Sequence, residues 1–348
     1  MALRPNPTQS ASSRGGLARP LTRRVLVFAA LLGLLLLALV LGVAEGTVKI
    51  GALEVIQAVT GAVPNPIITE LRLPRVLGAM LVGAVLGLCG AAFQGLFRNP
   101  LADPYLMGSA AGAAFGVTVA VALAGGLTAA FSTNAVFERI PVSATLFGFL
   151  GAVGAVALTL LLSGGASRTN DLILAGVLVS SVLTSLTTLL LLHDANRVFS
   201  VFAYTVGNLA FVGWDGVRSI ATYFLLTLGR TLNALSLGEE TARSLGLPLG
   251  RLKLVIIGAV TLLTASAVAY AGIIGFVGLV APHALRRILG GDYRYLLPAS
   301  ALGGAVLLAF ADLLARVLVA PAELPVGVLT TLLGGPFFLY LMWRGRAR

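Results

Sequence analysis

Charged side chains are scarce in this sequence. Only 11% of its 348 residues are Asp, Glu, Lys or Arg, while 58% are hydrophobic and the mean hydropathy is +0.99. Soluble domains carry about 25% charged residues, so this composition excludes an ordinary soluble protein. We therefore expect an all-α, polytopic integral membrane protein in contact with membrane lipid, because helices satisfy their own backbone polar groups inside a bilayer.

Cysteine and histidine are nearly absent. The single cysteine, Cys89, cannot form a disulfide within the chain and lies in an apolar run, which predicts a small core residue. The two histidines, His193 and His283, lie far apart in the sequence, so local spacing predicts no metal site. His283 follows Pro282, where we expect the start of a short helix. Nothing in the sequence indicates a metal or another cofactor.

Lysine occurs only twice, at Lys49 and Lys253, and neither residue ends a G-x-x-x-x-G-K stretch. The chain therefore lacks the phosphate-binding loop that ATP hydrolysis by a P-loop enzyme requires. The stretch LLSGGA at 161–166 resembles the signature loop of ATP-binding cassettes, but its two glycines favour a cytosolic turn. We expect a protein that is not an enzyme, since an enzyme of membrane-soluble substrates would need a catalytic constellation that is not visible here.

Long apolar runs are abundant instead. A membrane crossing takes about 20 apolar residues, and the runs predict ten crossings. A signal peptide is the alternative for the first run, but no A-x-A cleavage site follows it. Residues 253–285 could also form one long crossing rather than two short ones. The ten predicted crossings are 25–44, 76–96, 106–124, 141–162, 171–192, 217–233, 253–271, 272–285, 297–318 and 327–343.

The basic residues predict the orientation of these crossings. If the N-terminus is inside, the cytosolic segments hold 17 of the 24 Lys and Arg residues, as the positive-inside rule requires. Both termini then face the cytosol, and two short crossings fit residues 253–285 better than one. Residues 1–24 contain five arginines and no acid, and we expect a disordered basic tail there, followed by one transmembrane domain at 25–348. The net charge of +11 thus reflects topology rather than binding to nucleic acid.

Two glycine pairs have the spacing of close helix contacts. Gly83 and Gly87, and likewise Gly112 and Gly116, are four residues apart, so each pair lies on one helix face. Small residues there let helix backbones approach each other in lipid. In a chain with 42 glycines, chance spacing is an equal explanation for either pair.

Acidic residues within the crossings are rare. Asp312 is the clearest, and Arg316 lies four residues later, so the two share a helix face and can pair. Such a pair is either a structural contact or part of a transport mechanism. An ion-coupled secondary transporter, which is the main alternative function, is expected to carry more unpaired acids at mid-membrane depth.

One charged segment interrupts the apolar chain at 235–250, LSLGEETARSLGLPLG. Glu239 and Glu240 favour a helix N-terminus through the helix dipole, Gly246 suits a C-terminal cap, and Pro248 ends the helix. The pattern predicts one or two turns of cytosolic helix. A helix this short is not stable by itself and needs further contacts to remain ordered, and its charged outward surface suits docking in a groove of another protein.

The residues LGEETARSLGLPLGRLK at 237–253 closely resemble the coupling segment of FecCD-type permeases, which belong to ABC importers for vitamin B12, iron-siderophores and haem. The resemblance continues in order along nearly the whole chain. Further matching stretches are LRLPRVLGAMLVGAVLGLCGAAFQGLFRNPLADPYLMG at 71–108, LILAGV at 172–177, GFVGLVAPHALRRILGGDYRYLLP at 275–298, ADLLAR at 311–316 and ELPVGVLTTLLGGPFF at 323–338.

This resemblance implies a ten-helix, type II ABC importer permease in the cell inner membrane. It implies as partners a second permease subunit, cytosolic ABC ATPase subunits that supply the energy, and a periplasmic or lipoprotein substrate-binding protein. It does not distinguish among iron-siderophore, haem and cobalamin as cargo. By resemblance, the residues that contact the ATPase are Leu237, Gly238, Glu239, Glu240, Ala242, Arg243, Leu245 and Gly246.

The resemblance also assigns roles to residues outside the coupling segment. Arg72, Arg75 and Arg316 match positions that receive acidic residues of the binding protein at the outer surface. Snorkelling of these arginines to the membrane interface is the alternative. The fifth and tenth crossings line the translocation pathway in relatives. In this sequence the corresponding pathway residues of the fifth crossing are Ser180, Ser181 and Thr184. Residues just before that crossing narrow the inner end in relatives, and they correspond to Thr169 and Asn170.

Overall fold

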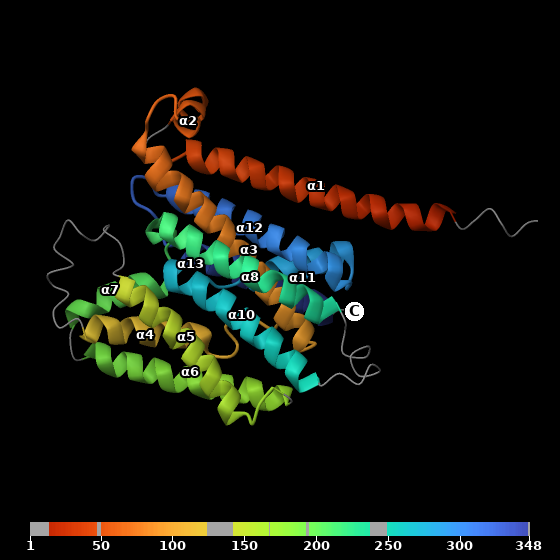
Figure 1. The fold of residues 1–348 in the computed structure, drawn as a ribbon, viewed down its shortest axis with the longest axis vertical. Coiled ribbons are helices and arrows are strands. Elements are labelled where there is room, and N and C mark those ends of the chain that lie inside the picture. The colour runs from red at the N-terminus through yellow and green to blue at the C-terminus, as the bar shows by residue number, and fades with distance from the viewer. Residues whose placement is uncertain are drawn as a thin grey trace, which may run out of the picture.

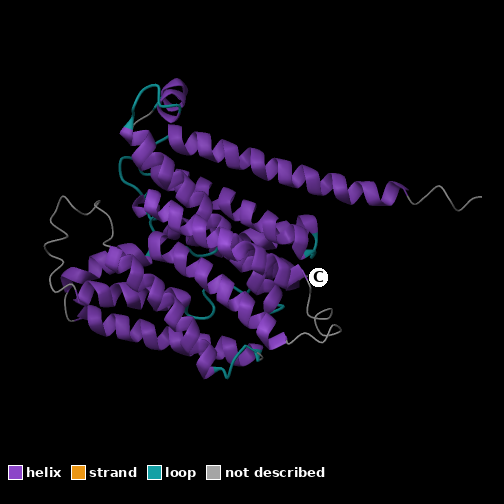
Figure 2. Cartoon of the chain, viewed as in Figure 1, coloured by secondary structure: helices purple, strands orange, loops and turns teal. Residues whose placement is uncertain are grey.

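The computed structural model describes residues 14–46, 50–123, 142–166, 168–192, 195–236 and 249–346, and every regular element within these ranges is helical (Figures 1 and 2). The helices are α1 (Arg14–Ala44), α2 (Ala52–Val59), the π-helix η1 (Ile67–Arg72), α3 (Leu73–Leu96), α4 (Ser109–Leu123), α5 (Val142–Leu162), α6 (Thr169–Leu192), α7 (Ala195–Thr205), the 3₁₀ turn η2 (Leu209–Phe211), α8 (Trp214–Ser236), α10 (Leu249–Ala271), α11 (Val277–Leu289), α12 (Tyr293–Val317) and α13 (Val326–Arg346).

Each predicted crossing overlaps one of these helices. Among the described residues, six helical segments are long and apolar enough to span a membrane by themselves, and two apolar helices are shorter. The six lie in α1, η1 with α3, α5, α6, α10 and α12, and the shorter two lie in α4 and α13. The prediction of an all-α polytopic membrane protein is confirmed.

The region 253–285 forms two helices, as the charge rule favoured. α10 ends at Ala271, and α11 begins at Val277 after a break in which Gly272 and Phe276 have positive φ angles of 70° and 67°. With 13 residues α11 is about 20 Å long, which is less than the ~30 Å hydrocarbon core of a bilayer.

The predicted helix start near His283 is wrong, because Pro282 lies inside α11. Proline has no N–H to donate to the carbonyl four residues earlier, which here belongs to Gly278. Gln94 of α3 supplies the missing donor, with Nε2 at 3.4 Å from the Gly278 oxygen. The side chain of Gln94, from a neighbouring helix, therefore replaces the hydrogen bond that the proline cannot make within α11.

The basic N-terminal segment is helical earlier than the sequence suggested. α1 begins at Arg14, whereas we expected a disordered tail over 1–24. Extending an existing helix is much easier than nucleating one, so the apolar run that follows can propagate helix into this segment. Residues 1–13 lie outside the described part of the chain.

α3 forms the centre of the fold, and both glycine pairs make close helix contacts. Its most apolar stretch is 83% buried, against 11% for α1 at the edge of the bundle. Gly83 and Gly87 face the backbone of α12 at Gly304 and Ser300, where a Cβ atom would collide with carbonyl oxygens. Cys89 is fully buried in the same core, as predicted.

The second glycine pair joins α4 to α5 in the same way. Gly112 and Gly116 lie against the α5 backbone at Gly151 and Phe147, with no room for a Cβ atom on either glycine. Close packing, rather than chance spacing, therefore explains both pairs.

The helix ends define two ends of the bundle. We call the end that holds the first residues of α1 and the last residues of α13 the terminal end; the adjoining ends of α8 and α10 lie there as well (Figure 1). The opposite end holds the last residues of α1, the first residues of α3 and the last residues of α12 (Figure 1).

Candidate functional site

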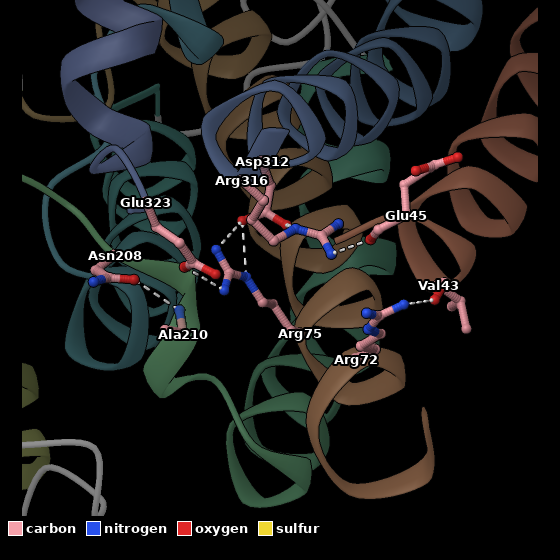
Figure 3. Close-up of polar contacts among 9 residues, drawn as sticks. All are labelled: Val43, Glu45, Arg72, Arg75, Asn208, Ala210, Asp312, Arg316 and Glu323. Atoms are coloured by element: carbon pink, nitrogen blue, oxygen red, sulfur yellow. Dashed lines mark hydrogen bonds and ion pairs between the residues drawn. The ribbon is translucent and has the colours of Figure 1, made fainter. Parts of the chain in front are cut away.

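Three arginines and two carboxylates meet at the opposite end of the bundle (Figure 3). Arg75 lies in the first turn of α3, after Pro74, and Asp312 and Arg316 lie one turn apart near the end of α12. Glu323 follows α12 in the segment that leads to α13. We call Arg72, Arg75, Asp312, Arg316 and Glu323 the charged cluster.

Arg75 bridges two carboxylates. Its Nε and Nη2 atoms each lie 3.0 Å from Asp312 Oδ1, and its Nη1 donates to Glu323 Oε2 at 2.8 Å (Figure 3). The Asp312 side chain is 1% exposed, Arg75 is 13% exposed and Glu323 is 39% exposed. Within the charged cluster, Asp312 is therefore the most buried residue and Glu323 the most exposed.

Arg316 approaches the other oxygen of Asp312. Its Nε lies 3.1 Å from Oδ2, which confirms the pairing predicted from their four-residue spacing. This contact is an ion pair without hydrogen-bond geometry. Arg316 Nη1 also donates to the backbone oxygen of Glu45 at 3.1 Å. Asp312 thus compensates two cations, which matters because an uncompensated buried charge costs several kcal/mol.

Arg72 joins the end of α1 to the start of α3. It is 7% exposed, and its Nη1 lies 2.9 Å from the backbone oxygen of Val43 (Figure 3) and 2.9 Å from that of Ala44. The last carbonyls of a helix have no partner within the helix, so an arginine donor satisfies them and favours the negative end of the helix dipole. Arg72 therefore caps α1 from a neighbouring helix.

The three arginines predicted at the outer surface are thus brought together, but each is engaged within the chain. Arg72 and Arg316 are 7% and 4% exposed. Sequence reasoning missed Glu323, although an acid closely following α12 is a signal that could have been used. Arg75 with Glu323 is the part of the cluster through which an outside partner could reach an arginine.

The coupling residues predicted at 237–246 lie outside the described part of the chain. The helices that flank them, α8 ending at Ser236 and α10 beginning at Leu249, have these ends at the terminal end of the bundle (Figure 1).

The pathway residues predicted in the fifth crossing lie on α6 at the edge of the bundle. Thr169 and Asn170 form its first turn, and Asn170, Ser181 and Thr184 are exposed. Ser180 and Ser181 donate to the carbonyls of Gly176 and Val177, four residues earlier. Back-bonding of this kind satisfies the hydroxyl protons, and the oxygens keep free acceptor capacity.

The glycines of LLSGGA form a turn after α5, as predicted. Gly164 and Gly165 have φ angles of 69° and 102°, and Ser163 Oγ donates to the Gly165 oxygen at 3.2 Å. Within the described residues, no group of three or more His, Cys, Asp or Glu side chains could hold a metal ion.

Comparison with known proteins places the chain in a family. The model of the FecCD transport family matches residues 31–344. The hemin transport system permease protein HmuU of Yersinia pestis is 38% identical over 91% of this chain and 96% of its own length. The iron(3+)-hydroxamate import system permease protein FhuB of Bacillus subtilis is 40% identical over 92% of this chain and 84% of its own.

A solved structure gives the same result at the level of the fold. The inward-facing conformation of a metal-chelate type ABC transporter has a TM-score of 0.74 and 32% sequence identity to this chain. The match covers 92% of this chain and 99% of that one. Together with ten helices at the predicted crossings, these matches establish that the chain belongs to the FecCD transport family.

Proposed function

We propose that this chain is the permease subunit of an ABC importer for an iron-siderophore, haem or cobalamin chelate. It would form the translocation pathway and take its energy from a separate ATPase. One observation carries this proposal: the chain matches transporter permeases along nearly its whole length, yet it has no P-loop of its own. A transporter of this family without that loop needs a partner to hydrolyse ATP.

The terminal end of the bundle faces the cytosol in this proposal, and the protein lies in the cell inner membrane. The positive-inside rule supports this orientation, because Arg286 and Arg287 at the end of α11 and Arg294 at the start of α12 all lie at that end. The segment 237–248 between α8 and α10 then has cytosolic flanks. An ATPase could contact Glu239, Glu240 and Arg243 there.

A second permease subunit would cover the weakly packed side of the chain. α6 is only 28% buried over its most apolar stretch, and α13 exposes Leu332, Leu333 and Trp343. On α6, the exposed Ser181 and Thr184 alternate with exposed leucines and valines. Lipid gives the free acceptors of a hydroxyl no donor, so a wet pathway between two subunits suits this face better than lipid does. Thr169, Asn170 and Ser180 would belong to the same pathway.

A substrate-binding protein would dock at the opposite end through the charged cluster. Arg75 is the arginine best placed for a partner's carboxylate, because its contact with Glu323 is partly exposed. Arg72 and Arg316 would act mainly by holding the ends of α1, α3 and α12 together. Their small exposed areas would add positive charge to the surface that the binding protein contacts.

The proposal is tested by reconstituting the permease in vesicles with its cognate ATPase and binding protein. Chelate should accumulate only when all three proteins and ATP are present. Absorbance spectra of the ligand that co-purifies with the binding protein identify the cargo. Accumulation that needs a proton gradient but neither ATP nor the ATPase would instead identify an ion-coupled secondary transporter and overturn the proposal.

A further inference from the structure

Five arginines from three helices gather at the terminal end of the bundle, away from the charged cluster. Arg24 and Arg286 are half-buried, while the other three are exposed. Within the described part of the chain, Asp292 at the start of α12 is the one acidic residue that forms an ion pair with any of them. We call this set the basic surface; it consists of Arg23 and Arg24 of α1, Arg286 and Arg287 of α11, and Arg294 of α12.

Arg24 attaches the start of the α1 crossing to α12. Its guanidinium carbon lies 3.8 Å from the centroid of the Tyr295 ring, in a cation–π contact. Its Nη2 is 3.9 Å from Asp292 Oδ2, which is a long ion pair. The other oxygen of Asp292 caps α12 by accepting from the backbone N–H of Arg294 at 3.1 Å. Asp292 therefore compensates little of the surrounding positive charge.

The guanidinium group of Arg286 has more hydrogen-bond donors than the described residues around it have acceptors. Both of its terminal nitrogens lie 3.3 Å from the hydroxyl oxygen of Tyr293, which is a neutral acceptor. Its Nε is buried and has no hydrogen-bond partner among the residues that the structure describes. The Tyr293 and Tyr295 rings thus position Arg286 and Arg24 without neutralising them, and a further anion would be accommodated here.

Apolar surface that is open to lipid adjoins the basic surface directly. Val25 and Leu26, which follow Arg24, are 59% and 64% exposed, and Ile288 beside Arg287 is exposed as well. The opposite face of α1 packs through Phe28 against α11 and α12. The start of the crossing is therefore held in place on one face and open to acyl chains on the other. A ligand that fits both parts has an anionic head and an apolar tail.

We propose that the basic surface binds the phosphate of an anionic phospholipid headgroup, with the acyl chains lying along the exposed face of α1. Lys and Arg near a membrane surface each attract anionic lipid by about 1 kcal/mol, or about fivefold in affinity. A free phosphate would use the arginines but gain nothing from Val25 and Leu26. The proposal requires neither the identity of the cargo nor a partner ATPase.

The test uses the full-length purified protein in nanodiscs that contain phosphatidylcholine with one fifth phosphatidylglycerol. Native mass spectrometry after release counts the phosphatidylglycerol that the protein retains. The wild type should retain it in clear excess over its share in the nanodisc, and Arg287→Gln should lower that enrichment about fivefold. Arg218→Gln is the matched control, because Arg218 is 76% exposed on α8 at the opposite end of the bundle; it should leave the enrichment unchanged.

Two results would overturn the proposal. The first is that the wild-type protein retains the two lipids in proportion to their abundance in the nanodisc. This result needs no variant, so it decides the question even if a variant fails to fold. The other comes from protein in pure phosphatidylcholine: if millimolar inorganic phosphate raised its melting temperature as much as phosphatidylglycerol does, the acyl chains would have no part in binding. We expect phosphatidylglycerol alone to raise it, and less so at high salt.

Discussion

Arg75 holds Asp312 and Glu323 with one guanidinium group, and the two carboxylates differ sharply in exposure. Asp312 is almost fully buried and also faces Arg316, whereas Glu323 is 39% exposed and contacts Arg75 through one 2.8 Å bond. Exposed ion pairs contribute about 0–1 kcal/mol, while breaking a buried pair costs about 3–5 kcal/mol. Under the proposed function, a carboxylate of the binding protein can therefore replace Glu323 at Arg75 but cannot replace Asp312.

Replacing Glu323 by Gln should strengthen docking of the substrate-binding protein. The change removes the carboxylate that competes for Arg75, so we expect the Kd to fall about two- to fivefold, which corresponds to about 0.4–1 kcal/mol. Surface plasmon resonance with the permease in nanodiscs measures it. Glu54→Gln on α2, an exposed glutamate at the same end, should leave the Kd unchanged. Weaker binding of the Glu323 variant would mean that Glu323 itself contacts the partner.

Replacing Asp312 by Asn should destabilise the fold even in the isolated permease. Arg75 would keep Glu323 as its only anionic partner, and Arg316 would lose its carboxylate and keep the backbone oxygen of Glu45, so we expect a loss of about 3–5 kcal/mol in the free energy of unfolding. Denaturant unfolding in detergent micelles provides the measurement. The control is Asp171→Asn, whose partner Arg168 is 82% exposed and whose loss should cost less than about 1 kcal/mol. Equal stability of the two variants would contradict the structural role of Asp312.

Alanine at Gly83 should separate α3 from α12. The added methyl group would meet the carbonyl of Gly304, so the backbones must move apart, at a cost of about 1–3 kcal/mol. Gly154 on α5 has open space around its missing Cβ atom, so Gly154→Ala should be neutral or stabilising by up to about 1 kcal/mol. Thermal unfolding in detergent compares them, and a Gly83 variant as stable as the Gly154 variant would contradict the close packing.

Reversing the charge of Glu240 should separate ATP hydrolysis from transport. If residues 237–246 contact the ATPase, Glu240→Arg should either release the ATPase during purification or leave ATP turnover without chelate uptake. Pull-down, ATPase assays and vesicle uptake on the same preparation distinguish these results. Glu54→Arg, at the opposite end of the bundle, is the control and should preserve assembly and coupling. Unchanged assembly, turnover and uptake with Glu240→Arg would refute the coupling assignment.

Local sequence patterns predicted much of this fold. Apolar run lengths located ten helices, and four-residue spacing predicted the Asp312–Arg316 pair, because these features repeat with the helix itself. The same spacing marked the faces of Gly83 and Gly112 as possible contacts, and only the structure decided between contact and chance. Spacing could not identify Glu323 as the partner of Arg75, since the two lie 248 residues apart and meet only through tertiary packing.

The misses have physical causes as well. Proline usually marks a helix boundary, so Pro282 suggested that a helix starts there. Proline is accepted inside α11 because Gln94, a residue of another helix, donates to the carbonyl that Pro282 leaves without a partner. α1 begins as early as Arg14 because helix propagates backwards from the apolar crossing that follows. The polar composition of the first residues gives no sign of this. The sequence alone also could not say that the three predicted docking arginines would be largely buried.

The bond from Gln94 to the Gly278 carbonyl also bears on how the bundle can rearrange. A hydrogen bond that would normally stay within one helix is here shared between α3 and α11, and Gly90 lies against Gly278 beside it. Sliding α11 along α3 would leave that carbonyl without a donor in a medium that offers none. We therefore expect α3 and α11 to move as one rigid body during transport, and helices without such a shared bond to provide the hinges.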